Sequence, residues 1–272
     1  MNTRILALAG IAALALTPLS AQAQDAKTDK GWQLSIGAGV VAAPTYLGDD
    51  DYQLLAIPNV RLTYADRFFA SPFEGIGYNV INTKGWRVGP IAKYNFGRDE
   101  DGDSPLRIAG DKTDDLRGLG DIDGTVELGG FSEYSYGNLL GKIELRQGLS
   151  GHEGFIGEAA LQYRTGFTLF GRRAAVAAGP KLVFGDDSYN SAYFDVNAQQ
   201  SAASGLSQFD AEGGLISYGV QSSLSLSITD AVSLIGFAGY DRLAGDAADS
   251  SLVQERGSEN QARIGVTLNY TF

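Results

Sequence analysis

The sequence lacks most of the residue types from which common active sites are built. It has no cysteine and one histidine among 272 residues, which excludes a disulfide framework, thiolate metal sites and clusters of histidine ligands. Its 21 basic residues stand against 32 acidic ones, and this balance excludes a general nucleic-acid binder, which needs a basic face. No apolar run beyond the N-terminal segment reaches the roughly 18 residues of a membrane-spanning helix, so a protein that crosses the membrane with helices is excluded as well.

Glycine is abundant instead, with 36 residues, and charged residues make up only 19% of the chain. This combination is typical of an all-β chain with many turns. At the N-terminus a basic residue precedes an uncharged apolar run over residues 5–16, and the small-residue sequence Ala-Gln-Ala ends at Ala23. These features predict a secretory signal peptide, residues 1–23, that is cleaved between Ala23 and Gln24. We expect the mature chain, residues 24–272, to form a single outer-membrane domain, because no linker marks a second one.

Apolar and polar residues alternate along several segments of the chain. A period of two predicts β-strands with one apolar and one polar face. In residues 216–228 the apolar series begins at Ile216 and faces away from a row of serines and glycines. The other alternating segments are residues 32–40, 86–96, 142–149, 158–169 and 262–272.

Three features favour a membrane barrel over a soluble β-sandwich. The predicted strands are mostly about ten to fifteen residues long, whereas soluble strands average about five or six and membrane strands need about nine to eleven. Aromatic residues such as Trp32 and Trp86 lie near strand ends, as in interfacial girdles. Tight turns alternate with long connections, and we expect the long ones to lie together at the outer face. These connections are residues 97–122, 185–213 and 244–259.

The number of strands follows from parity. Bacterial barrels have an even number of strands, with both chain ends on the periplasmic side. Residues 67–81 therefore fit better as two short strands around a turn at residues 71–74 than as one long strand. We predict an all-β fold, an antiparallel up-and-down transmembrane β-barrel of twelve strands, with ten as the alternative.

The last strand carries a pattern suited to outer-membrane assembly. It ends on an aromatic residue, Phe272, with apolar residues at every second position before it. A barrel must pair its last strand with its first, here residues 260–272 with residues 32–43, so that no edge remains in lipid. We expect the assembly machinery to recognise the terminal pattern. Its residues are Ile264, Val266, Leu268, Tyr270 and Phe272.

The polar face of the predicted strands is rich in charge. Opposite charges on neighbouring strands would pair inside the lumen. Two interpretations remain open: a salt-bridged plug that conducts nothing, which we favour for so narrow a barrel, and a basic constriction that passes small anions. The expected lumen-facing charged residues are Arg61, Arg87, Lys93, Glu127, Glu133, Lys142, Glu144, Arg146, Glu158, Arg164, Lys181 and Arg263.

The only histidine, His152, lies between Ser150 and Glu153. A serine, a histidine and an acid suggest a hydrolase triad. Triads are assembled from separate strands, however, and adjacent residues at one hairpin tip rarely point at each other. We therefore expect a polar hairpin tip here, no catalytic residues, and no metal or other cofactor anywhere in the chain.

Several segments together resemble a known family. Residues 95–101 (NFGRDED), 116–123 (LRGLGDID), 193–196 (YFDV) and 242–250 (RLAGDAADS) occur in an order and spacing similar to the MltA-interacting protein family (MipA/OmpV) of Gram-negative outer-membrane proteins. The resemblance covers residues 32–272, and the most specific part is residues 242–250. Ser251, where a proline is expected, is a small departure.

The resemblance implies a non-enzymatic barrel in the cell outer membrane. One member of the family is described as a scaffold that links a lytic transglycosylase to a bifunctional peptidoglycan synthase. The expected partners are therefore outer-membrane lipid, the outer-membrane assembly machinery, a lytic transglycosylase and a peptidoglycan synthase. A small-solute channel with a basic lumen is the alternative function.

Overall fold

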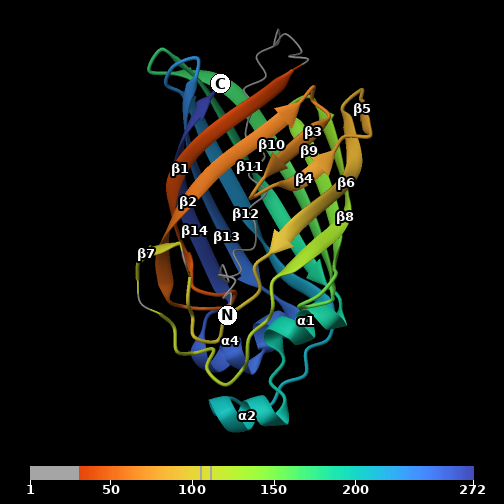
Figure 1. The fold of residues 1–272 in the computed structure, drawn as a ribbon, viewed down its shortest axis with the longest axis vertical. Coiled ribbons are helices and arrows are strands. Elements are labelled where there is room, and N and C mark those ends of the chain that lie inside the picture. Colours follow the sequence, from red (N-terminus) through yellow and green to blue (C-terminus); the bar gives the residue numbers. More distant parts are fainter. Residues whose placement is uncertain (1–30, 105, 111) are drawn as a thin grey trace, which may run out of the picture.

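The computed structural model describes residues 31–104, 106–110 and 112–272, so the predicted signal peptide and its cleavage site at Ala23 and Gln24 lie outside the described residues. The chain forms one antiparallel sheet that closes on itself through pairing of β1 with both β2 and β14 (Figure 1). Twelve strands make up the barrel, which confirms the predicted fold class and number. They are β1 (Trp32–Pro44), β2 (Tyr52–Tyr64), β3 (Phe68–Ser71), β4 (Gly75–Tyr78), β6 (Trp86–Asn95), β8 (Thr125–Tyr136), β9 (Leu139–Gly148), β10 (Phe155–Leu169), β11 (Arg172–Gly185), β12 (Gly214–Ser227), β13 (Val232–Leu243) and β14 (Asn260–Thr271).

Two further short strands lie off the barrel path. β5 (Ile81–Thr83) pairs with β6 beside the barrel strand β4, and β7 (Arg107–Ala109) pairs with β2. Both belong to connections between barrel strands. They add short stretches of pairing to β6 and β2, the two long strands that flank the four-residue strands β3 and β4.

The outer surface of the barrel is apolar and bounded by aromatic residues. Large side chains such as Ile264 and Val220 are 63% and 58% exposed, far more than a soluble surface leaves uncovered in continuous rows. At the end with the short turns, Trp32 stacks against Tyr64 with ring centroids 4.7 Å apart, and Trp86 stacks similarly on a neighbouring tyrosine. This band of apolar side chains between aromatic rings matches the hydrocarbon core and interfaces of a bilayer.

The first and last strands close the barrel, as predicted. The register places Val40 opposite Val266, and eight residue pairs join β1 to β14. The N–H of Phe272 donates to the carbonyl of Leu34 at 2.9 Å. Every strand edge in this part of the wall is therefore paired, as an apolar solvent requires.

The segment predicted as two short strands forms the hairpin β3–β4. Its strands have only four residues each, whereas β2 has thirteen and β6 has ten. Figure 1 shows that this hairpin fills only the part of the wall nearest the short turns, while β2 and β6 run on toward the long loops.

The three long connections gather at one end of the barrel, where four short helices form a cap over the mouth (Figure 1). In this cap, Phe194, Leu243 and Val253 share one apolar core, and Leu116 and Leu252 belong to a second. The sequence predicted long loops here, but not helices. The helices are α1 (Asp187–Phe194), α2 (Ala198–Ser204), α3 (Gly245–Asp249) and α4 (Ser251–Arg256). None of the helices in the described part of the chain is long and apolar enough to cross a membrane.

One outward position was predicted wrongly. Ile216 is 1% exposed and packs in the cap core instead of facing outward. The pairing of β11 with β12 shifts register between Val183 and Phe184, and such a bulge re-aims the side chains of the bulged strand. The alternation of Tyr218 and the residues after it is unaffected.

The terminal strand offers a test of barrel assembly. Deleting Phe272 removes the hydrogen bond to Leu34 and the terminal aromatic residue, and we expect the deletion to reduce the folded protein in the outer membrane at least fivefold. The folded barrel is measured as the band that shifts when samples are boiled before electrophoresis. Phe272→Tyr, which keeps the aromatic ring, is the control and should leave the amount unchanged. A deletion variant that folds at wild-type abundance would contradict the predicted assembly signal.

Candidate functional site

Arg146 is the centre of a buried network of charges in the lumen. It projects from β9 and is 4% exposed. Its Nε donates to Glu127 Oε2 at 2.6 Å and its Nη2 to Glu158 Oε1 at 2.8 Å, while its Nη1 contacts Glu144. The three carboxylates come from β8, β10 and β9 itself, so one guanidinium ties three adjacent strands together. Charged groups buried this deeply are tolerated only when they are paired in this way.

Two lysines complete this network on its inner side. Lys93 Nζ lies 2.5 Å from Glu144 Oε1, and Lys142 Nζ lies 2.9 Å from Glu144 Oε2. Lys142 also approaches Glu133, which pairs with Arg87. The cations and carboxylates of the network therefore balance, and side chains occupy the middle of the barrel.

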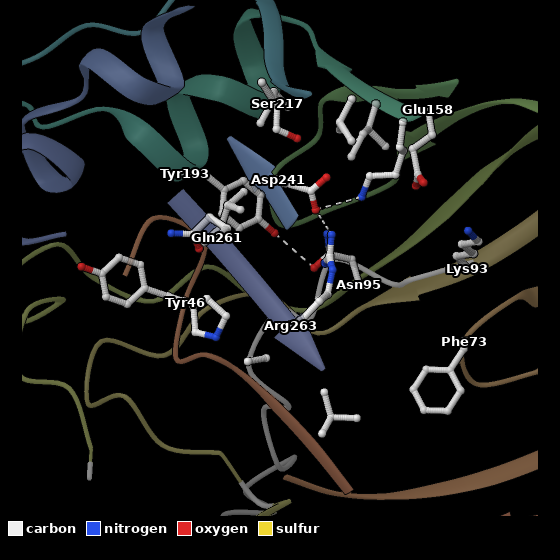
Figure 2. A pocket seen from close by; sticks show the side chains of 18 of the residues that line it. Tyr46, Phe73, Lys93, Asn95, Glu158, Tyr193, Ser217, Asp241, Gln261 and Arg263 are labelled. Atoms are coloured by element: carbon white, nitrogen blue, oxygen red, sulfur yellow. Dashed lines mark hydrogen bonds and ion pairs between the residues drawn. The ribbon is translucent and has the colours of Figure 1, made fainter. Parts of the chain in front are cut away.

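A second cluster of charges continues around the barrel from the first network, on β11, β13 and β14. Asp241 on β13 contacts the Arg263 guanidinium on β14, and its Oδ2 lies 3.4 Å from Lys181 Nζ on β11. Figure 2 shows Asp241 and Arg263 pointing toward each other at the cavity. Asp241 is thus the ion-pair partner of two cations, and Glu158 lines the same cavity (Figure 2).

The structure brings most of the predicted lumen residues together. Eleven of the twelve charged side chains expected there form ion pairs with one another or with Glu74 and Asp241. Arg164 is the other one: its buried Nε and Nη2 have no hydrogen-bond partner among the described residues. Glu74, which pairs with Arg61 at 2.7 Å, and Asp241 were missed. Asp241 shares its face of β13 with Ile235 and Phe237, so alternation gave no polar series there, and Glu74 lies in a turn and gave no periodic signal.

His152 belongs to the network and does not form a triad. Its Nδ1 accepts from the N–H of Gly154 at 3.0 Å, so the ring proton is on Nε2, which donates to Glu127 Oε1 at 3.1 Å. The hydroxyl of Ser150 lies instead 3.2 Å from that of Thr125. The arrangement holds Glu127 in place from a second side and does not present a nucleophile.

Hydrogen bonds join the charged network to the cap. Asn95 donates through Nδ2 to Glu127 Oε1 at 3.0 Å, and its Oδ1 accepts from the hydroxyl of Tyr193 on α1 at 3.1 Å (Figure 2). Arg98 in turn donates to the carbonyl of Tyr193 at 2.8 Å. Burial raises the pKa of the Tyr193 hydroxyl to about 12, so it remains a donor at physiological pH. These hydrogen bonds therefore fix the cap to the charged side chains of the lumen, and the cap covers that end of the barrel.

Asp49 is a buried carboxyl group in the cap. It is fully buried, and its Oδ1 accepts from the N–H of Asp51 at 3.1 Å. Burial, together with the nearby Asp115, raises its pKa from 3.8 to about 7 against the lowering effect of the backbone hydrogen bond from Asp51. The ionised form is therefore costly in the folded protein.

A cavity of about 140 Å³ remains between the charged network and the cap. Figure 2 shows it with Tyr46 on one side and Phe73 on the other. The lining combines apolar side chains, such as Phe237, with Lys181 and other charged groups. No cluster of three or more histidine, cysteine or acidic residues suited to a metal ion occurs in the described residues.

These features define the class of the protein. A closed antiparallel barrel with a charged interior, an apolar outer band and aromatic girdles is an outer-membrane β-barrel. Within this class, the chain belongs to the family described as MltA-interacting protein MipA, whose model matches residues 36–272.

No curated protein matches the sequence. Solved structures with some similarity include Neisserial surface protein A, with 8% identity, a TM-score of 0.27, and 89% of this chain and 97% of that chain covered. The NanC porin has 10% identity and a TM-score of 0.39, with 87% and 98% covered. The outer membrane protein OprG from Pseudomonas aeruginosa has 12% identity and a TM-score of 0.23, with 91% and 99% covered.

Removing the central guanidinium should destabilise the barrel strongly. Arg146→Met leaves Glu127 and Glu158 without their shared partner, and breaking a buried pair from one side costs about 3–5 kcal/mol. The free energy of unfolding is measured by urea titration in detergent or lipid. Arg173→Gln is the control, because its pair with Asp230 is exposed and worth less than about 1 kcal/mol. Equal losses in the two variants would contradict the importance of the buried network.

The raised pKa of Asp49 predicts a pH dependence of stability. Below about pH 4 the carboxyl is protonated in both states and has no effect; between pH 4 and 7 only the folded state keeps the proton, so stability falls as the pH rises. Asp49→Asn should therefore stabilise the protein at pH 9 by up to about 4 kcal/mol and have little effect at pH 4. Unfolding of both proteins is followed across this pH range. Asp50→Asn, at an exposed position, is the control and should show no such difference.

Proposed function

We propose that this chain is a non-enzymatic anchor that holds a lytic transglycosylase, and through it a peptidoglycan synthase, at the outer membrane. The observation that carries the proposal is membership of a family described as MltA-interacting protein. The lumen supports it, because paired charges fill the barrel and a packed cap covers one end. Within such a barrel the accessible surfaces for a protein partner are the cap and the rim of short turns.

The rim of short turns is the face that suits a periplasmic partner. With the long loops outside, as expected from the sequence, the short turns face the periplasm. The β10–β11 turn presents Phe170, which is 88% exposed, followed by Arg172 and Arg173. An exposed aromatic residue beside arginines is a common composition for the centre of a protein interface.

Capture of the transglycosylase from membranes tests the proposal. The tagged wild-type protein, purified in mild detergent, should enrich a lytic transglycosylase, and the double variant Phe170→Asp, Arg172→Glu should lower the captured amount at least fivefold. Glu255→Lys, an exposed change in α4 at the opposite end, should leave capture unchanged. Absence of the transglycosylase from repeated wild-type purifications would overturn the proposal. Loss in both variants would argue against the short-turn rim.

A small-solute channel is the second candidate, because the cations Arg164, Lys181 and Arg263 lie on the lumen side of the wall. Planar-bilayer recording separates the two functions. The anchor proposal predicts no stepwise conductance in the wild-type protein. Anion-selective steps that change with the double variant Arg87→Gln, Arg164→Gln would favour the channel.

A further inference from the structure

The barrel wall is incomplete between β2 and β6. Hairpin β3–β4 pairs with β2 only from Leu62 onward and with β6 only up to Ala92. On the side toward the long loops, the described residues contain no strand that bridges β2 and β6. The short β7 covers only Leu54 and Leu55 of β2. Figure 1 shows β2 and β6 diverging below the hairpin.

The sequence of β2 is adapted to an unpaired edge at this place. The N–H of Ala56 donates to the carbonyl of Leu106 at 2.8 Å, on the side of the gap. Backbone groups alternate sides along an antiparallel strand, so the nitrogen of Pro58 faces the same gap. Proline has no N–H to satisfy, and it occurs in sheets mainly where a strand has a free edge. The edge of β2 at the gap therefore has one backbone N–H fewer to satisfy than an ordinary strand edge.

The cavity lies directly behind this gap. Its lining includes Ile57 from β2, Phe73 from the β3–β4 turn, and Tyr94 from β6. Tyr94 lies on the outward face of its strand and is 49% exposed. The cavity is thus lined both by lumen side chains and by residues from the two edges of the gap. One of these residues, Tyr94, faces outward.

The two sides of the cavity differ in chemistry. Val41, Ile57 and Phe237 form an apolar wall, whereas the other side is charged. Its cations are Lys93, Arg146, Lys181 and Arg263, and its carboxylates are Glu127, Glu158 and Asp241. An apolar cavity of about 150 Å³ holds one benzene ring, so in this cavity of about 140 Å³ the apolar part of a ligand has about six carbons. Four cations against three carboxylates leave one positive charge in surplus, which selects a negative end group.

We propose that the gap between β2 and β6 is a lateral entrance from the membrane, and that the cavity behind it binds a small amphipathic carboxylate with an apolar body of about six carbons. The carboxylate contacts Lys181, and the apolar body packs on Phe237 and Ile57. A molecule of this kind partitions into the outer part of a bilayer with its apolar end inward. It can reach the gap without passing the capped mouth.

Binding of three six-carbon probes tests the charge selection. Isothermal titration of the full-length protein, folded in a nonionic detergent, should show hexanoate binding at least tenfold more tightly than hexylammonium, with 1-hexanol between them. Lys181→Met should weaken hexanoate binding at least fivefold and leave 1-hexanol unchanged. Asp241 keeps its Arg263 partner in this variant, so the wall remains neutralised.

Two further variants make the test specific. Phe237→Trp fills the cavity and should abolish binding of both hexanoate and 1-hexanol. Lys142→Met removes a lysine of the same lumen that does not line this cavity, and Glu144 retains Lys93 and Arg146, so hexanoate binding should be unchanged. Equal affinity for the three probes, or equal losses in Lys181→Met and Lys142→Met, would overturn the proposed site.

The lateral route is tested separately in lipid vesicles. The chain has no cysteine, so single-cysteine variants react at one position only. Ile57→Cys, behind the gap, should react at least tenfold faster with the membrane-soluble N-phenylmaleimide than Ser225→Cys, a buried position on β12. A sulfonated maleimide confined to water should show no such preference. Equal rates for the two positions with N-phenylmaleimide would exclude entry through the gap.

Discussion

Backbone hydrogen bonding in an apolar solvent is the constraint on which this structure depends. Lipid offers no partner for an exposed N–H or carbonyl, so each strand must pair on both sides. Closure of β1 against β14 meets this requirement for the two ends of the chain. The outward rows of apolar side chains, the aromatic girdles and the inward charges all follow from the same closed sheet, because alternation gives every strand one lipid face and one lumen face.

Pairing of opposite charges explains how so narrow a barrel can contain so many of them. A barrel of this size leaves a lumen that side chains largely fill. Arg146 satisfies three carboxylates from three adjacent strands, and His152 and Asn95 supply further donors to Glu127. This network is both the filling of the lumen and the link to the cap. The buried charges are therefore explained by their structural role, without a pathway for a solute through the lumen.

The sequence predicts the wall much better than the cap. Alternation specified the strands, their inward and outward faces and, with parity, their number, because a period of two is a local property of the chain. The cap depends on contacts between distant segments, such as the bond from Arg256 to the carbonyl of Asp115. Its helices have only five to eight residues, too short for a clear apolar period, and the capping box of Asn197 and Gln200 at α2 is the local signal that was missed. Ile216 was misplaced for a related reason, because a bulge depends on pairing with the neighbouring strand.

The wall departs from the rule that every strand pairs on both sides at one place, the gap between β2 and β6. A full-length hairpin at β3–β4 would pair both edges, yet each strand stops after four residues. The edge of β2 is covered only in part, by the backbone contact of Ala56 with Leu106 and by β7. Pro58 removes one of the donors that the gap exposes. An unpaired edge in lipid is costly, so retention of an edge that is only partly covered, directly in front of a cavity lined by apolar and basic side chains, argues that the opening itself has a use.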